Sequence, residues 1–113
     1  MNDDTYAEII NDLCAVLGID NSQTEASDYK LLIAKLNIAI RAIKSARNYP
    51  ESWKTETIKN DLDNYYANIF DLTIYEYNQI GAEGEVSHNE NGTSRSYKSR
   101  RESFIGVVPF ARA

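Results

Sequence analysis

The side chains that most often carry out chemistry are few and scattered in this chain of 113 residues. Its one cysteine, Cys14, and its one histidine, His88, are far apart in the sequence and have no companions at the spacing of a zinc site. Cys14 fits a small buried hydrophobic residue on a helix, and it has no partner for an internal disulfide. His88 fits a solvated strand residue beside a turn. We therefore expect no catalytic residues, no bound metal and no cofactor.

Three short motifs resemble known sites but lack the groups that those sites need. The acidic run Asp61-Leu-Asp63-Asn64 is similar to part of a calcium loop, yet it has neither the glycine nor the terminal glutamate and lies in a predicted helix, so we interpret it as a solvated helix face. Gly81-Ala-Glu-Gly84 lacks the Lys and Ser/Thr of a phosphate loop. Asn91-Gly-Thr93 matches a glycosylation acceptor by chance, because the acidic start of the chain does not fit a signal peptide.

The basic side chains are concentrated near the C-terminus. Residues 95–113 hold 5 Lys/Arg against 1 Asp/Glu, whereas residues 1–94 hold 7 against 16, and the whole chain has a net charge of −5. Within this basic arm, Arg, Lys and Tyr alternate from Ser94 to Arg101, a pattern that can contact a nucleic-acid backbone and stack on bases. The alternative is an arm that docks on an acidic protein surface. The acidic body favours this second interpretation.

The apolar tail beyond Ser103 is too short to build a core of its own. Each large apolar side chain in it contributes about 1.5–3 kcal/mol when fully buried, so the tail either folds back on the helices or inserts into a partner. We expect that removing residues 103–113 abolishes partner binding and leaves a folded helical domain. The basic arm and the tail together supply the predicted partner-binding residues, for a larger partner or a neighbouring subunit: Arg95, Tyr97, Lys98, Arg100, Arg101, Phe104, Ile105, Val107, Val108 and Phe110.

Three amphipathic helices are predicted before this arm. The first spans about Thr5 to Leu17, with a capping box formed by Thr5 and Glu8 at its start and Gly18 at its end. The second spans about Ser27 to Asn48 and the third about Thr55 to Gln79. The predicted fold is thus mainly α, a small bundle of three main helices in a single domain, residues 1–113, with a helical body over about residues 5–80.

The second helix is apolar around an unusually wide arc and needs cover on more than one side. It is either the central helix of the domain or partly covered by a neighbouring subunit, and the two can both hold. On the third helix, two further apolar residues fall off the buried stripe. These features predict four candidate subunit contacts: Ile33, Ile40, Ile74 and Tyr75.

A C-terminal β-hairpin is predicted over about residues 85–98, because Asn91-Gly92 is the preferred pair for a two-residue type I′ turn. An isolated two-stranded hairpin is marginally stable in water. It must therefore rest on the helices or on another chain. Beyond it, a docking segment is expected over about residues 99–113.

Four parts of the sequence together resemble one protein family. They are Arg41-Ala-Ile-Lys-Ser-Ala-Arg-Asn-Tyr-Pro50, the helix with Tyr65-Tyr66, the stretch Gly81-Ala-Glu-Gly-Glu-Val-Ser87 with Asn91-Gly92 and Arg95-Ser-Tyr97, and the end Ile105-Gly-Val-Val-Pro109. In order and spacing, from about Leu31 to the C-terminus, the chain resembles the small head–tail connector proteins of long-tailed bacteriophages. These head-completion or adaptor proteins are sometimes labelled DNA-packaging proteins.

The resemblance implies a structural virion protein without catalytic residues. About a dozen copies would form a homo-oligomeric ring under the phage portal protein, extend the DNA channel and offer a platform to a downstream connector or tail protein. DNA would pass through without specific binding. The C-terminal segment from Arg95 would dock on the portal, and the hairpin would contact a neighbour or line the ring.

The same resemblance implies a place at the head–tail interface of the virion, after assembly in the host bacterial cytoplasm. No membrane partner is expected, since no apolar run approaches the roughly 20 residues that span a bilayer. The alternative is a small helical regulator that binds nucleic acid through its basic arm. An enzyme is the third class, and the residue pattern favours it least.

Overall fold

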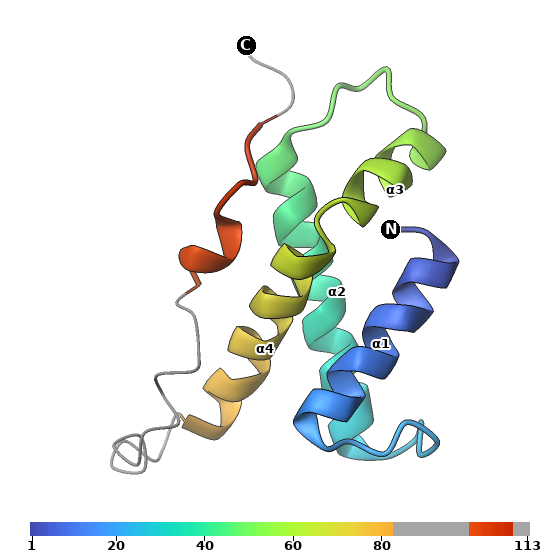
Figure 1. Ribbon diagram of the computed structural model, residues 1–113, viewed down its shortest axis with the longest axis vertical. Coiled ribbons are helices and arrows are strands. Elements are labelled where there is room, and N and C mark those ends of the chain that lie inside the picture. Colours follow the sequence, from blue (N-terminus) through green and yellow to red (C-terminus); the bar gives the residue numbers. More distant parts are fainter. Residues whose placement is uncertain (83–99, 110–113) are drawn as a thin grey trace.

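The structure, a computed structural model, describes residues 1–82 and 100–109. In these two ranges the chain forms four α-helices and one short 3₁₀ helix: α1 (Asp3–Leu17), α2 (Ser27–Arg47), α3 (Thr55–Asp63), α4 (Tyr66–Ala82) and η3 (Glu102–Phe104). The predicted mainly helical fold is confirmed (Figure 1). The predicted hairpin, residues 85–98, falls outside the described residues and stays a prediction.

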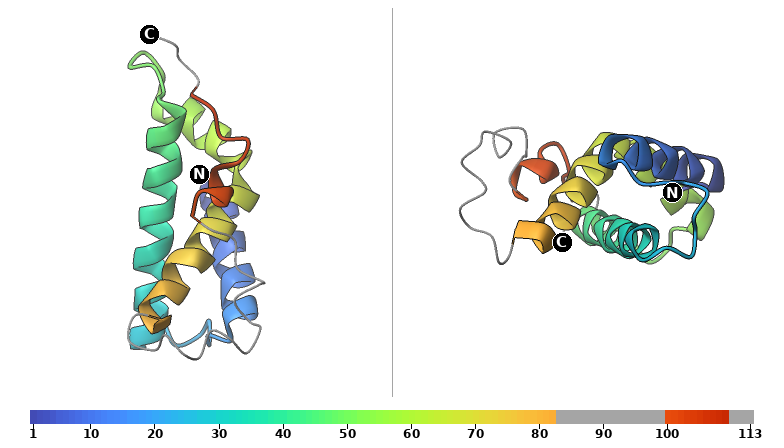
Figure 2. Two further views of the ribbon diagram at one scale, coloured as in Figure 1. Left: turned by 90° about the vertical axis from the view of Figure 1, so that its left-hand side faces the viewer. Right: turned by 90° about the horizontal axis from the view of Figure 1, so that it is seen from below.

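Helix α4 is the element on which the others assemble. Its most extensive contact is with α2, and it also packs on η3 and α1. The C-terminal segment, residues 100–109, lies along one side of α4, whereas α1 lies along the opposite side (Figures 1 and 2). The wide apolar arc of α2 is thus covered mainly by α4, while Ile38 on α2 keeps 49% of its surface exposed.

The core consists of aliphatic side chains at helical spacing, which places them on one stripe of each helix. Cys14 is 3% exposed, so the prediction of a small buried residue is confirmed. Burial raises the pKa of its thiol, and the nearby carboxylates of Asp28 and Asp20 raise it further. The other residues of the core are Ile9, Leu13, Leu32, Leu36, Ala39, Ile43, Leu62, Ile69 and Leu72 on the helices, with Ile19 in the loop after α1.

The end of α1 follows the sequence prediction, but its start does not. Gly18 adopts the left-handed conformation with φ 73° and donates its backbone N–H to the carbonyl of Cys14. At the other end, α1 begins at Asp3, so the predicted capping box at Thr5 is wrong. The Thr5 hydroxyl instead donates to Asp63 Oδ2 at 3.0 Å, because Thr5 lies inside the helix and faces α3.

The predicted third helix is two helices, so the prediction of three main helices is wrong. The backbone N–H of Asn64 donates to the carbonyl of Asp61, and that of Tyr65 to the carbonyl of Leu62, at 3.0 and 2.9 Å. These tighter bonds end α3, and α4 continues in a new direction (Figure 1). Apolar burial continues on both sides of the break, so the hydrophobic stripe alone could not reveal it.

Candidate functional site

The C-terminal segment is held along α4 by polar contacts at two levels. Near the end of α4, Arg100 Nε donates to Glu76 Oε2 at 2.8 Å. Further along, the side-chain amide of Asn68 donates to the backbone carbonyls of Ser103 and Ile105, at 2.9 and 2.8 Å. One amide group therefore holds the backbone on both sides of Phe104 and fixes the path of the segment.

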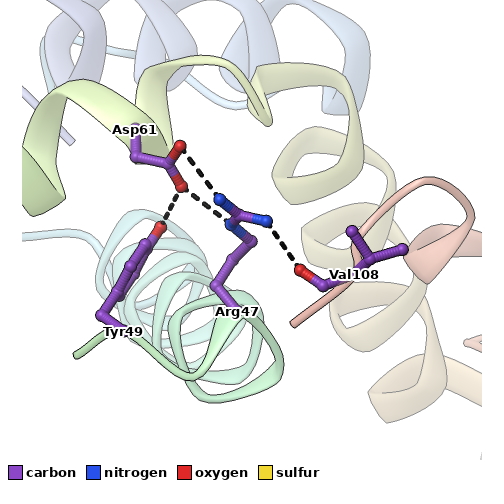
Figure 3. Close-up of polar contacts among 4 residues, drawn as sticks. All are labelled: Arg47, Tyr49, Asp61 and Val108. Atoms are coloured by element: carbon purple, nitrogen blue, oxygen red, sulfur yellow. Dashed lines mark hydrogen bonds and ion pairs between the residues drawn. The ribbon is translucent and has the colours of Figure 1, made fainter. Parts of the chain in front are cut away.

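A third contact ties the segment to the end of α2 through Arg47 (Figure 3). The Arg47 guanidinium donates from Nη1 to the backbone carbonyl of Val108 at 2.7 Å. Its other edge donates to Asp61 of α3 through Nε at 2.8 Å and Nη2 at 3.2 Å, in the bidentate geometry that suits a carboxylate. The Tyr49 hydroxyl donates to Asp61 Oδ2 at 2.6 Å. Arg47 thus links α2, α3 and the C-terminal segment.

The Arg47 guanidinium is buried, with 6% of the residue exposed. Its Cζ atom lies 5.1 Å from the ring centroid of Tyr65 and 5.7 Å from that of Tyr49. Burial acts to lower the pKa of Arg47, but the hydrogen bonds to Asp61 and Tyr49 and the charge of Asp61 outweigh it, and the pKa is raised. Arg47 therefore remains a cation that holds a carboxylate and a carbonyl at once.

Tyr49 also keeps its proton, but here burial and the hydrogen bond act in the same direction. Burial raises the pKa of its phenol, and the hydrogen bond to the Asp61 carboxylate raises it further. The hydroxyl therefore keeps its proton throughout the range in which proteins are folded. Its ring also stacks on Trp53, with 5.4 Å between the ring centroids. Tyr49 thus fixes the loop between α2 and α3 against Asp61 of α3, and its stacking on Trp53 joins the two ends of this loop.

The C-terminal segment buries one set of its side chains and exposes another. Ser103 is 1% exposed, and Phe104 and Val107 pack against the core. Ile105 and Val108 are 72% and 59% exposed. Folding back on the helices, one of the two outcomes expected for the apolar tail, is thus observed for Phe104 and Val107. Insertion into a partner stays a prediction for the exposed Ile105 and Val108.

The remaining candidate residues fall into three groups. Arg101 is exposed, next to Arg100 and its ion pair with Glu76. The four candidate subunit contacts are all half-buried, and Ile40 and Ile74 pack against the core. The others lie outside the described residues: Arg95, Tyr97, Lys98 and Phe110.

Sequence reasoning missed the residues that anchor the segment. The interpretation of the run Asp61 to Asn64 as a solvated face is wrong for Asp61, whose side chain is 18% exposed and lies in the ion pair with Arg47. A signal for Arg47 was present, because it continues at helical spacing the α2 seam that contains Ala39 and Ile43. A charged residue that helical spacing places among buried apolar residues indicates that a partner of opposite charge is buried beside it.

Two further properties concern the described part of the chain. Over residues 1–82 and 100–109, no helix combines the length and the apolarity needed to cross a bilayer. Across the same residues, no group of three or more His, Cys, Asp and Glu side chains is arranged to hold a metal ion. Arg47, Asn68 and Glu76 fix the position of the chain's own C-terminal segment.

Comparisons with protein-family models, with curated proteins and with solved structures find no match to this chain. The resemblance to phage head–tail connectors therefore rests on the residues of the sequence itself.

Proposed function

We propose that this protein is a structural virion component, a head–tail connector or adaptor that assembles as an oligomeric ring under a phage portal. In this role it extends the DNA channel and provides a platform for tail attachment. In this proposal, the hairpin predicted from the sequence for about residues 85–98 contacts a neighbouring copy or lines the ring. The order and spacing of the motifs, from about Leu31 to the C-terminus, support the choice of family.

One observation carries the assembly role. Ile105 and Val108 are 72% and 59% exposed on a segment whose path is fixed by the buried Arg47 and by Asn68. Scattered exposed apolar residues are common on protein surfaces. These two differ because they lie three residues apart on a segment held in place by specific contacts. A positioned apolar surface of this kind suits a protein partner.

The charges of the arm support a protein partner over a nucleic acid. Arg100 forms an ion pair with Glu76 and lies 5.4 Å from the ring centroid of Phe104, so its charge is already partnered within the chain. The body that carries the arm is acidic. Its field repels a phosphate backbone, which suits a protein that DNA passes without binding.

The test is the mass of the purified protein, alone and mixed with portal proteins encoded by neighbouring genes, measured by light scattering. We expect a complex with many copies of this chain on each portal. The variant Ile105→Asp with Val108→Asp should lose this complex, because two charges replace the exposed apolar surface. Its helical circular dichroism should match that of the wild type, since both side chains are exposed.

The matched control is Ile38→Asp, which places a charge at an exposed isoleucine in the middle of α2. This variant should keep the complex. A gel shift with duplex DNA on the same samples tests the regulator. Tight, salt-sensitive DNA binding by the monomer, without any portal complex, would overturn the connector role in favour of a nucleic-acid-binding regulator.

A further inference from the structure

A second apolar surface lies on the other side of α4. Residues of α1 and α4 line an open groove of about 420 Å³, within the size range of ligand pockets. Val16 of α1, 62% exposed, forms part of its wall. The rings of Tyr66 and Phe70 on α4 stack with 6.3 Å between their centroids and form another part. The groove therefore offers aliphatic and aromatic surface to an apolar side chain.

The border of this groove is acidic. Asp12 on α1 and Asp71 on α4 both line it. The Tyr66 hydroxyl donates to Asp12 Oδ2. Burial raises the pKa of the Tyr66 phenol, and the hydrogen bond to Asp12 and the charges of Asp12 and Glu8 raise it further. The negative charges near Tyr66 also favour the binding of a positively charged ligand.

The exposed face of the C-terminal segment has the complementary composition. Ile105 and Val108 are its two exposed aliphatic side chains. Arg101 is also exposed and lies four residues before Ile105 in the chain. Between the two aliphatic residues, Gly106 has φ 88° and turns the backbone. The segment thus presents two apolar side chains and the cation of Arg101, with Glu102 exposed between them, where the groove presents apolar side chains and carboxylates.

The two surfaces cannot meet within one molecule in the arrangement observed. The C-terminal segment lies on one side of α4 and α1 lies on the other (Figures 1 and 2). Arg47 and Asn68 hold the segment on its own side. Complementary surfaces on different faces of one chain meet only between copies, and such head-to-tail contacts generate closed rings or open filaments.

We propose that the groove between α1 and α4 binds the C-terminal segment of a second copy of this chain, with Ile105 and Val108 on Val16, Tyr66 and Phe70. Arg101 of that copy faces the carboxylate of Asp12. The contact supplies the interface between neighbours that the proposed ring needs, and in that respect it rests on the proposed function. It assigns Ile105 and Val108 to the contact between neighbouring copies and leaves direct contacts with the portal to other parts of the chain. Charging these two residues should then abolish the portal complex because the ring does not assemble.

The test is disulfide cross-linking between two single-cysteine proteins, made in a Cys14→Ala background and mixed under mild oxidation without portal. One protein carries Val16→Cys and the other Ile105→Cys. We expect a covalent dimer of the two to form several-fold faster than in a control mixture of Ile38→Cys with Ile105→Cys, because Ile38 is exposed on α2 outside the groove. Adding Arg101→Glu to the Ile105→Cys protein should slow the cross-link several-fold, and Asp12→Lys on the partner should restore it.

Equal rates in the two mixtures, or no cross-linked dimer in either, would overturn the inference. Rescue of Arg101→Glu by Asp12→Lys would show that these two residues meet in a specific contact. Random collisions between unfolded or aggregated chains would not produce such a rescue. The result is separable from the connector role. A portal complex without the cross-link rejects the groove alone, and a cross-link without any portal complex rejects the connector role and keeps the groove.

Discussion

Asp61 and Asp63 lie two residues apart on α3 and connect it to different parts of the molecule. Because successive helical residues are about 100° apart, the two carboxylates point away from each other. Asp61 faces the end of α2 and pairs with the buried Arg47. Asp63 faces the start of α1 and accepts hydrogen bonds from the backbone N–H and the side-chain amide of Asn2, at 3.0 and 2.7 Å, and from Thr5.

The difference between the two carboxylates lies in their partners. Asp61 neutralises the charge of Arg47, a residue that is only 6% exposed. Arg47 in turn donates a hydrogen bond to the Val108 carbonyl of the C-terminal segment. The hydrogen-bond donors to Asp63 are the neutral groups of Asn2 and Thr5, both half-buried. Removing a charge from beside a buried cation leaves that cation without compensation, whereas neutral donors near the surface can bond to water. We therefore expect the contacts of Asp61 to stabilise the fold more than those of Asp63, although both are made by carboxylates of α3.

The largest expected effect is from Asp61→Asn. It removes the charge beside Arg47 and should lower the free energy of unfolding by about 3 kcal/mol. Denaturant unfolding followed by circular dichroism measures this. The matched control is Glu56→Gln, which removes an exposed carboxylate from the same helix and should change stability by less than about 0.5 kcal/mol. A loss for Asp61→Asn no greater than for the control would show that Arg47 finds other compensation.

Tyr49→Phe tests the same site with a smaller change. It removes the hydroxyl that donates to Asp61 at 2.6 Å and leaves the ring on Trp53. Because the lost hydrogen bond has a charged acceptor, we expect the free energy of unfolding to fall by about 1.5 kcal/mol. In a double-mutant cycle with Asp61→Asn the two losses should be less than additive. Full additivity would mean that the Tyr49 hydroxyl does not act through Asp61.

Asp63→Asn has the smallest expected effect, about 1 kcal/mol near neutral pH, because the amide oxygen can still accept from Asn2. Burial acts to raise the pKa of Asp63, but the hydrogen bonds from Asn2 and Thr5 and the terminal amino charge outweigh it and lower the pKa below its ordinary 3.8. Stability from this carboxylate is therefore present above that ordinary value and is lost as the pH falls through the lowered one.

The wild type and Asp63→Asn should accordingly become closer in stability as the pH is lowered from neutral into the acid range. Equilibrium unfolding of both proteins at a series of pH values measures the difference. A difference that stays constant through the acid range would contradict a role of the ionised carboxylate in holding α1.

Much of the helical fold could be predicted from local pattern. The apolar stripe of the first helix and its glycine end depend on residues close together in the chain, so Gly18 was identified correctly. The break between α3 and α4 was not predicted, because Asn64 and Tyr65 include neither proline nor glycine and the apolar stripe continues past them. The capping box failed because Thr5 has a partner, Asp63, that is distant in sequence.

Sequence patterns predicted which residues belong to the candidate site, but not which contacts hold them in place. The apolar and basic residues of the C-terminal segment were identified from the sequence. Which of them face inward was not, since the segment has no regular period beyond η3 (Glu102–Phe104). The anchors Arg47 and Asn68 contact residues more than 30 positions away, and single-sequence patterns do not report such pairs.

The sequence by itself determined a mainly helical chain with an acidic body and a basic, apolar end, because charge and helical periodicity are local properties. Only the tertiary structure decided that Arg47 is buried on Asp61 and that Ile105 and Val108 remain outside. The reason is physical: burial depends on which distant surfaces cover a side chain, and the break after α3 sets where those surfaces lie.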